Sequence, residues 1–371
     1  MRVFVFHWKD ITHPYAGGAE RLLHHFMTET TKLGHCVTWF CSKYDHSTDE
    51  EIVDGIRIVR RGGQFLVYLH AAFIYFRYRK KTDVVIDSIT GIPWFTMLYS
   101  SKPTLAIIYH LGKRETFFTE LPAQKGMIGY FFAFVGWFSE SIIPFLYKKT
   151  KIMTFSEDTR KDIVHLGIPE GHVHVAQEGI DLSKHKPIKT RGNSPNVVCV
   201  GRLVRNKGVE YLITAMKCVV QQIPNVKLYI IGVGPFRAKL EEIVESLGLK
   251  KNVTFLGFVS EEKKIGYLQR ATVLVLPSLR EGWATPVIEA NACGTPAIGA
   301  DVTGVNTAIV EGVTGFVFPY GNVRELANKI LKILCDPKLT EEMGTNSYIW
   351  AQRFDKKLTL ERFFQIIGSL F

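Results

Sequence analysis

The sequence has few cysteines and lacks the motifs of several common enzyme classes. Its six cysteines are scattered, with no Cys-x-x-Cys pair. This spacing predicts reduced thiols in the cytoplasm rather than a disulfide framework or a zinc site. No HExxH, GxSxG, GKS or GKT motif occurs, which argues against zincins, serine hydrolases of the α/β type and P-loop NTPases. Because there is also no Asp-x-Asp pair, no motif predicts a metal held by carboxylates.

A secretion signal and an excess of acidic residues are also missing. The first residues, MRVFVFHWKD, lack the long apolar core and small-residue cleavage site of a signal peptide, and we expect them to begin a fold as a strand. A chain of 371 residues, 46% hydrophobic and 22% charged, fits two globular domains of moderate size. The net charge of +11 favours anionic partners: phosphates, nucleic acid or an acidic membrane surface.

Short apolar runs alternate with longer amphipathic segments along the chain. We expect a first series of strands at 2–6, 36–40, 84–87, 104–109 and 152–155, with a helix at 19–34. A polar linker is expected at 181–196, and a second series of strands at 197–201, 227–232, 253–257, 273–277, 296–300 and 315–318. The pattern predicts an α/β protein with two tandem Rossmann-like, doubly wound parallel-sheet domains. We place them at 1–185 and 186–345, and expect a C-terminal helix at 346–371 to pack back on the first domain.

Two segments of the first domain are apolar and aromatic and end in basic residues. Residues 126–151 nearly reach the length of about 20 apolar residues that spans a bilayer, but Ser139, Glu140 and Pro144 interrupt them, and we expect no spanning helix. Residues 65–81 follow the same pattern. These segments either cover the first sheet as buried helices or lie on an anionic membrane surface as interfacial helices. The sequence leaves both interpretations open.

A basic loop follows the first expected strand of the second domain. In VCVGRLVRNKGVEYL (198–212), Arg202, Arg205 and Lys207 precede a helix that begins near Val209. Helix N-termini expose unpaired N–H groups and favour anions, so three cations at this position indicate a diphosphate site. A solvated basic loop is the alternative.

Two glutamates stand eight positions apart in LREGWATPVIEANACGTP (279–296). Glu281 lies in the loop after an expected strand. Thr285 as N-cap and Pro286 as first helical residue predict a helix that places Glu289 just past its first turn. Ligands bind at the carboxyl edge of α/β sheets, and carboxylates accept hydrogen bonds from sugar hydroxyls, so the pair indicates a site for a polyhydroxylated anion. For Glu289, a favourable charge near a helix N-terminus is the alternative.

Two features of the first domain also point to a ligand. HPYAGGAERLLHHF (13–26) places Gly17 and Gly18 directly before a helix, where glycine lets the backbone approach a ligand closely. His110 follows an apolar strand, again at the carboxyl edge of a sheet. A simple tight turn and a core histidine are the respective alternatives.

Together these motifs resemble those of the retaining glycosyltransferases of family 4 (GT4), which have the GT-B fold of two Rossmann-like domains facing a cleft. The resemblance covers most of the chain and is strongest from about 196 to 318. Its most specific part is the E-x7-E motif from Glu281 to Glu289. GRLVRNKG resembles the family's phosphate-binding loop and GGAER its N-terminal glycine loop. TFSEDTRKDI (154–163) and EGID (178–181) resemble the segment before its second domain.

The resemblance implies a nucleotide-sugar donor, as a substrate rather than a cofactor, and transfer without a metal ion. It implies that Arg202 and Lys207 bind the diphosphate, that Glu289 binds the ribose hydroxyls and that Glu281 contacts the donor sugar. His110 is expected beside the reacting carbon. The other implied donor contacts are Gly17, Gly18, Phe258, Val259, Gly282, Trp283, Ala284 and Thr285.

The implied mechanism is a front-face displacement with retention of configuration. The leaving diphosphate takes the acceptor's proton, while Arg202 and Lys207 stabilise its growing negative charge. Two stretches depart from the family. EGWA replaces the usual EGFG-type run, and in TGVNTAIVEG Thr303 and Thr307 stand where the family often has glycine and glutamate.

The function expected from these features is transfer of a hexose from a UDP- or GDP-sugar to a lipid-linked or glycan acceptor. The protein is expected to be cytoplasmic, or peripheral on the inner face of the cell membrane. The alternatives are a soluble transferase with a small-molecule or sugar acceptor, a non-catalytic GT-B binding protein and a nucleic-acid-associated protein. A nucleic-acid partner is disfavoured because the aromatic residues form helical blocks instead of alternating with basic ones.

Overall fold

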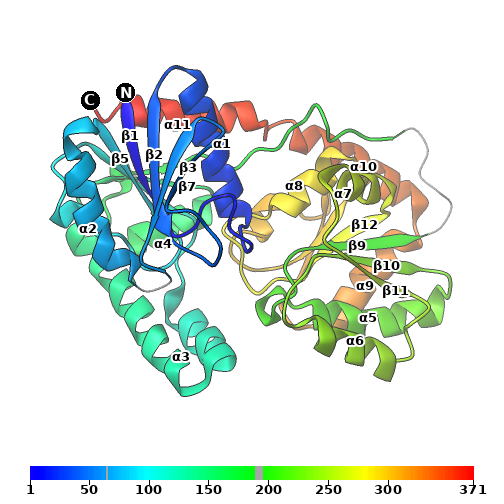
Figure 1. Cartoon of the computed structure of the whole chain (residues 1–371). Helices are drawn as coiled ribbons and strands as arrows, with labels where there is room; N and C mark the ends of the chain where they lie inside the picture. The colour runs from blue at the N-terminus through cyan, green and yellow to red at the C-terminus, as the bar shows by residue number, and fades with distance from the viewer. Residues whose placement is uncertain (64–65, 189–194) are drawn as a thin grey trace. The chain divides into compact units, whose positions relative to one another are not determined.

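The structure, a computed structural model, describes residues 1–63, 66–188 and 195–371 and divides them into two compact units (Figure 1). The first unit comprises Met1–Gln177 and Leu360–Phe371, and the second comprises Glu178–Thr359. The end of the chain therefore belongs to the first unit. Of the expected linker at 181–196, residues 189–194 lie outside the described residues.

The first unit is built on a sheet with the strand order β3-β4-β2-β1-β5-β6-β7-β8. Its neighbouring strands are parallel, except that β3 runs antiparallel to β4 at one edge. Residues of β5 and β6 are buried throughout, as expected for central parallel strands covered on both faces. The strands are β1 (Arg2–Phe6), β2 (Cys36–Ser42), β3 (Glu50–Val53), β4 (Ile56–Arg61), β5 (Val84–Ile89), β6 (Thr104–Ile108), β7 (Lys151–Thr154) and β8 (Val173–Val175).

The β3–β4 hairpin and β8 are absent from the sequence-based prediction. Asp54 and Gly55 form the hairpin turn with positive φ values of 47° and 82°, which Asp-Gly pairs adopt readily. The strand β3, EEIV, is acidic and largely exposed, and β8 has three residues. Both lie at an edge of the sheet, where a strand needs no continuous apolar run, so periodicity alone did not reveal them.

Helices complete the first unit. Phe26 of α1 stacks on Phe363 of α11, with ring centroids 4.6 Å apart, so the C-terminal helix adds to the core of this unit. The helices are α1 (Gly18–Lys32), α2 (Val67–Tyr78), α3 (Lys113–Leu146), α4 (Glu157–His165) and α11 (Lys356–Gly368), the last of which belongs to this unit from Leu360.

The two aromatic segments form α2 and α3, and each leaves a stripe of large apolar side chains exposed. On α2 the stripe is Leu69, Phe73 and Phe76, at i, i+4 and i+7. On α3, which bends at Gly126 (φ 59°, ψ −140°), it is Met127, Phe131, Phe134, Phe138 and Phe145. Other residues of the same helices are buried, such as Ile74 and Ile143. The described side chains of these helices are therefore buried on one side and exposed on the other.

Part of α3 also meets the length and composition of a membrane-crossing helix. Within the described residues, one such window was found, Gly129–Leu146, and a third of it is buried. The same test is passed by core helices of soluble proteins, so the window by itself does not assign a membrane span.

The second unit has a parallel sheet with the strand order β11-β10-β9-β12-β13-β14. The strands are β9 (Asn196–Val200), β10 (Lys227–Ile231), β11 (Val253–Gly257), β12 (Val273–Leu276), β13 (Ala297–Ala300) and β14 (Gly315–Phe318). The helices are α5 (Val209–Gln222), α6 (Arg237–Ser246), α7 (Glu261–Arg270), α8 (Thr285–Ala292), α9 (Val323–Leu334) and α10 (Pro337–Ala351). Each strand predicted for this half of the chain is confirmed.

The strand order identifies a topological switch point in each sheet. In the second unit the chain builds outward from β9 to β10 and β11, then returns to place β12 on the other side of β9. The first unit has the same reversal between β1 and β5. Loops separate at such a switch point, and ligands of doubly wound sheets bind at the carboxyl ends of the strands there.

Candidate functional site

The loops that follow β9 and β12 carry the basic and acidic residues predicted from the sequence. The first loop includes a short 3-10 helix, η4 (Arg205–Lys207), and leads into α5. The second leads into α8. The N–H of Leu279 donates to the carbonyl of Asn206 at 2.8 Å, so a backbone hydrogen bond connects the two loops.

Lys207 and Glu281 form an ion pair across these loops. The Nζ of Lys207 lies 2.5 Å from Oε1 of Glu281, and both side chains are mostly buried, with exposed fractions of 16% and 15%. Gly208 permits the approach: its φ is 63°, and a Cβ there would lie 2.2 Å from the carbonyl oxygen of Pro277. A side chain at this position would push the two loops apart.

The Glu281 loop is also held from the side of β13. The N–H of Glu281 donates to the carbonyl of Thr303 at 3.1 Å. Gly304 has a φ of 78°, and a Cβ there would lie 2.1 Å from the carbonyl oxygen of Glu281. Thr303 makes this contact through its backbone, which explains why threonine can stand where the family often has glycine.

The start of α8 differs from the prediction by one residue. Ala284, not Thr285, is the N-cap, and Thr285 is the first helical residue. The hydroxyl of Thr285 instead donates to Oε2 of Glu178 at 3.1 Å, while the indole N–H of Trp283 donates to the Glu178 carbonyl at 2.9 Å. The hydroxyl therefore serves a tertiary contact, which local capping rules do not foresee.

Burial distinguishes the residues of the EGWA run. Trp283 packs against Phe354 with ring centroids 5.3 Å apart, and it and Ala284 are buried. Both predicted donor contacts are therefore packed in the interior of the unit, and little of their surface is accessible at the loop. Gly282 is half-buried between them and Glu281.

Burial also sets the ionisation of Glu178. Loss of solvent raises the pKa of Glu178 to about 7, despite the hydrogen bond from Thr285, and the negative charge of Glu289 adds to this shift. A carboxyl group that titrates near neutrality thus lies against the first turn of α8. Sequence reasoning passed over it, because EGID was interpreted only as part of the connecting segment.

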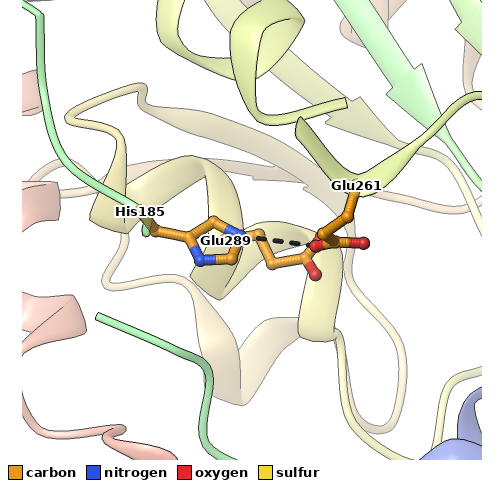
Figure 2. A group of neighbouring side chains, drawn as sticks. All are labelled: His185, Glu261 and Glu289. Atoms are coloured by element: carbon orange, nitrogen blue, oxygen red, sulfur yellow. Dashed lines mark ion pairs between the residues drawn. The ribbon is translucent and has the colours of Figure 1, made fainter. Parts of the chain in front are cut away.

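Glu289 belongs to a charged cluster on α7 and α8 (Figure 2). Its Oε1 lies 2.7 Å from Nζ of Lys264, which also lies 2.9 Å from Oε1 of Glu261. Burial disfavours the charged form of Lys264, but Glu289 and Glu261 outweigh it and hold the pKa of Lys264 above its ordinary value. Glu289 itself is buried, with 8% of its surface exposed. The carboxylate is therefore fixed in place before any ligand binds.

The remaining predicted residues of the second unit lie at the same carboxyl edge. Arg202, two residues beyond β9, is exposed. Phe258 and Val259 follow β11, and Phe258 is 73% exposed. The second unit thus brings Lys207 and Glu281 together at the switch point, and Arg202 lies on the loop that follows β9.

The glycine loop of the first unit follows β1. Gly17 is the N-cap of α1, and its N–H donates to Oε2 of Glu20 at 2.6 Å. The other Glu20 oxygen lies 3.3 Å from Nε2 of His7 and 3.5 Å from Nζ of Lys9. Burial alone would raise the pKa of Glu20, but the hydrogen bond from His7 and the charges of His7 and Lys9 lower it to about 2.

A polar network extends from this loop to the neighbouring strands. Nδ1 of His7 lies 2.8 Å from Oγ of Ser88 at the end of β5, and the hydroxyl of Tyr109 donates to the carbonyl of Ala19 at 3.3 Å. His110, the next residue, is exposed at the end of the β6 segment. Sequence reasoning missed His7, Glu20 and Ser88, although GGAER contains Glu20.

The arrangement suits recognition of a negatively charged, hydroxyl-rich ligand. In the second unit, cations stand beside helix α5 at a switch point, and carboxylates held by lysines stand on the adjoining loop and helix. Cations and helix N-termini bind phosphates, whereas oriented carboxylates bind hydroxyl groups. A nucleoside diphosphate joined to a sugar carries both kinds of group.

Comparison with known proteins gives two family matches. Residues 16–184 match the family described as "Glycosyltransferase Family 4", and residues 182–350 match "Glycosyl transferases group 1". Together they cover most of the chain, and they meet close to the division between the two units.

Individual relatives match over shorter stretches. The chain is 35% identical over 153 residues to alpha-D-kanosaminyltransferase of Streptomyces kanamyceticus, covering 41% of this chain and 40% of that protein. It is 29% identical over 167 residues to a GDP-mannose-dependent alpha-(1-6)-phosphatidylinositol monomannoside mannosyltransferase of Mycolicibacterium smegmatis, covering 43% of this chain and 44% of that protein. The chain thus matches about half the length of such curated relatives.

Solved structures agree over the whole chain. Sucrose-phosphate synthase from Thermosynechococcus elongatus superposes with a TM-score of 0.82 at 22% identity, covering 100% of this chain and 98% of that one. Anabaena HepE in complex with UDP and glucose superposes with a TM-score of 0.76 at 18% identity, covering 100% of both chains. At this identity the likeness concerns the fold, which is GT-B as predicted.

Proposed function

Because the chain belongs to glycosyltransferase family 4, we propose that it transfers a hexose from a UDP- or GDP-sugar to an acceptor hydroxyl with retention of configuration. The Lys207–Glu281 pair at the switch point of the second unit carries this proposal. It holds a cation suited to a diphosphate and a carboxylate suited to sugar hydroxyls within hydrogen-bonding distance of each other. The relatives above support the transferase class and leave the donor open.

The proposed chemistry uses charge rather than a protein base. The anomeric carbon parts from the diphosphate oxygen on the same face on which the acceptor oxygen bonds to it. The acceptor's proton passes to the leaving diphosphate oxygen. In this proposal Arg202 and Lys207 stabilise the negative charge on that diphosphate, and His110 is the residue assigned to the reacting carbon, as the family resemblance implies. Preorganised cations of this kind lower the barrier without moving during the reaction, so the transfer needs no metal ion.

In this proposal the two glutamates hold the donor and do not act as acid and nucleophile. Glu281 binds hydroxyls of the sugar, and Glu289 binds those of the ribose. Each already lies within hydrogen-bonding distance of a lysine, Lys207 or Lys264, which holds its carboxyl group in position. Gly17 and Gly18 of the first unit leave room for the donor and acceptor.

The proposed acceptor is a lipid-linked or glycan molecule at the cytoplasmic face of a membrane. Two observations support it: the exposed apolar stripes of α2 and α3, and the basic residues that follow them, Arg79, Lys80 and Lys81 after α2 and Lys148 and Lys149 after α3. Aromatic side chains beside lysines suit the interface of an anionic bilayer. A soluble transferase with a sugar acceptor is the second candidate, favoured if these stripes bind no lipid.

The test is thermal unfolding with UDP, GDP, ADP and their sugar conjugates. A ligand at a hundred times its dissociation constant stabilises the folded protein by about 2.7 kcal/mol. We expect a shift with one nucleotide family, followed by transfer in which the anomeric proton coupling of the product shows retention. No shift with any nucleotide at millimolar concentration, with lipid vesicles present, contradicts the proposal.

A further inference from the structure

A cation already occupies the space between Glu261 and Glu289. The Lys264 ammonium lies 2.9 Å from one carboxylate and 2.7 Å from the other. Glu289 and Lys264 are largely buried, with side-chain exposures of 11% and 14%, whereas Glu261 is 45% exposed. Two converging carboxylates of this kind attract a positive charge, and one of them can still move toward solvent. Alone, this is an ordinary ion-pair cluster.

His185 makes the cluster different. Its side chain is 4% exposed, and its Nδ1 lies 2.9 Å from the carbonyl oxygen of Asp181. A carbonyl only accepts hydrogen bonds, so Nδ1 carries the proton and the lone pair of the neutral ring is on Nε2. That buried nitrogen has no hydrogen-bond partner among the described residues. Figure 2 shows the ring directed at the carboxylates, with Nε2 3.8 Å from Oε1 of Glu261.

We propose that His185, Glu261 and Glu289 form a binding site for a divalent transition metal of the zinc type, which replaces the Lys264 ammonium. An ammonium satisfies the carboxylates but cannot use a nitrogen lone pair, whereas a metal ion uses all three groups. The hydrogen bond from Nδ1 to a backbone carbonyl is the outer contact that orients metal-binding histidines. One imidazole nitrogen with two carboxylates favours zinc, cobalt or nickel over magnesium and calcium, which prefer oxygen alone.

The geometry requires a small contraction. The three ligand atoms lie within 4.8 Å of one another. Tetrahedral zinc, with bonds of about 2.0–2.2 Å, places its ligand atoms about 3.3 Å apart. Glu261 is partly exposed and its side chain can rotate inward, while the displaced Lys264 can extend toward solvent. A water molecule would complete the coordination.

The site shares Glu289 with the proposed ribose contact. If the proposed function holds, metal and nucleotide compete for one carboxylate, so bound zinc inhibits the transferase. This consequence rests on the proposed function, whereas metal binding itself does not. Zinc binding without competition from UDP or GDP supports the metal site and removes the ribose role of Glu289.

The test is calorimetric titration of the metal-free full chain with zinc chloride. Exposed Cys36, Cys218 and Cys335 are first replaced by serine, because surface thiols also bind zinc. We expect one saturable site. His185→Ala and Glu261→Gln should each weaken it by more than about tenfold, on the scale known for altered metal sites. His165→Ala, an exposed histidine of the first unit, is the matched control and should change nothing.

Lys264→Met gives the sharpest result, because it removes the competing ammonium and keeps most of the length of the side chain. Its zinc affinity should rise by tenfold or more. X-ray absorption at the zinc edge should show one imidazole ligand that is lost in His185→Ala. Glu261→Gln, at an exposed position, keeps the test valid if His185→Ala fails to fold. Absence of a saturable site, or unchanged affinity in Glu261→Gln and Lys264→Met, overturns the proposal.

Discussion

Lys207 and Glu281 are 74 positions apart in the chain, yet Nζ of one lies 2.5 Å from Oε1 of the other. The contact joins the loops that follow strands β9 and β12. These parallel strands are neighbours because the chain, after adding β10 and β11 on one side of β9, adds β12 on its other side. Each residue holds the side chain of the other in place. In the proposed function, a diphosphate sugar meets groups that are already oriented, which is the condition for electrostatic catalysis.

Replacing Lys207 tests this arrangement directly. Lys207→Ala should lower turnover by about a hundredfold or more, since it removes a transition-state charge contact and leaves Glu281 unpaired. Lys239→Ala serves as the control, because Lys239 pairs with Glu242 on the exposed surface of α6. Steady-state rates with the donor identified by thermal shift provide the measurement. A variant that retains the wild-type rate removes Lys207 from the mechanism.

Replacing Glu289 tests the ribose contact. Glu289→Gln should raise the dissociation constant of the nucleoside diphosphate roughly tenfold to a hundredfold, because a hydrogen bond to a charged group contributes about 1.5–3 kcal/mol. The measurement is calorimetry with the unsubstituted diphosphate. Glu262→Gln, on the exposed side of α7, should bind normally. Equal affinities in both variants place the ribose elsewhere.

The glycine loop allows activity to be separated from stability. Gly18 is the first residue of α1, a methyl group added at its Cα would point into open space, and its φ is not in the left-handed region. Gly18→Ala should therefore unfold at the same temperature or slightly higher, since alanine favours a helix by up to about 1 kcal/mol over glycine. If the donor approaches this backbone, turnover falls at least tenfold. Unchanged turnover shows that no ligand comes close.

The pKa of Glu178 near 7 predicts a specific pH dependence of stability. The folded protein binds the proton more tightly than the unfolded chain, whose glutamate titrates near 4.5. The free energy of unfolding therefore falls as the pH rises from 4.5 through 7, by at most about 3 kcal/mol. Glu178→Gln, which keeps an acceptor for Thr285, should be more stable than wild type at pH 8 and equal at pH 4.

Denaturant unfolding at both pH values measures this difference. Glu262→Gln controls for loss of a negative charge on a basic protein. If the free energy of unfolding of Glu178→Gln differs from that of wild type by the same amount at both pH values, the carboxyl group is not protonated in the folded protein at neutral pH.

The exposed stripe on α3 predicts lipid binding. The double variant Phe131→Ser and Phe138→Ser should lose most co-sedimentation with anionic vesicles at low salt. Both side chains are more than half exposed, so stability should change by less than about 0.5 kcal/mol. As the control, Leu33→Ser with Ile52→Ser removes exposed apolar side chains from the end of α1 and from β3. Equal binding by both double variants removes the membrane role of this stripe.

Local sequence signals were sufficient for much of the fold. Apolar runs bounded by glycine and polar residues identified every strand of the second sheet, because a buried parallel strand must be continuously apolar. The E-x7-E spacing placed one glutamate in a loop and the other on a helix, since the loop and helix lengths follow from neighbouring residues. These features depend on contacts within a few positions of each residue.

The tertiary structure decided which of those residues meet. The partners of Glu281, Glu289 and Thr285 come from loops and helices that periodicity cannot align, 74, 25 and 107 positions away. Edge strands such as β3 were not predicted, because backbone pairing with a neighbouring strand stabilises them and they need no apolar run in the sequence. The sequence by itself determined two α/β domains and placed the candidate site residues at the ends of strands. Only folding set the charge of Glu178, the burial of Trp283 and the direction of His185, because each depends on distant atoms that exclude water or supply a partner.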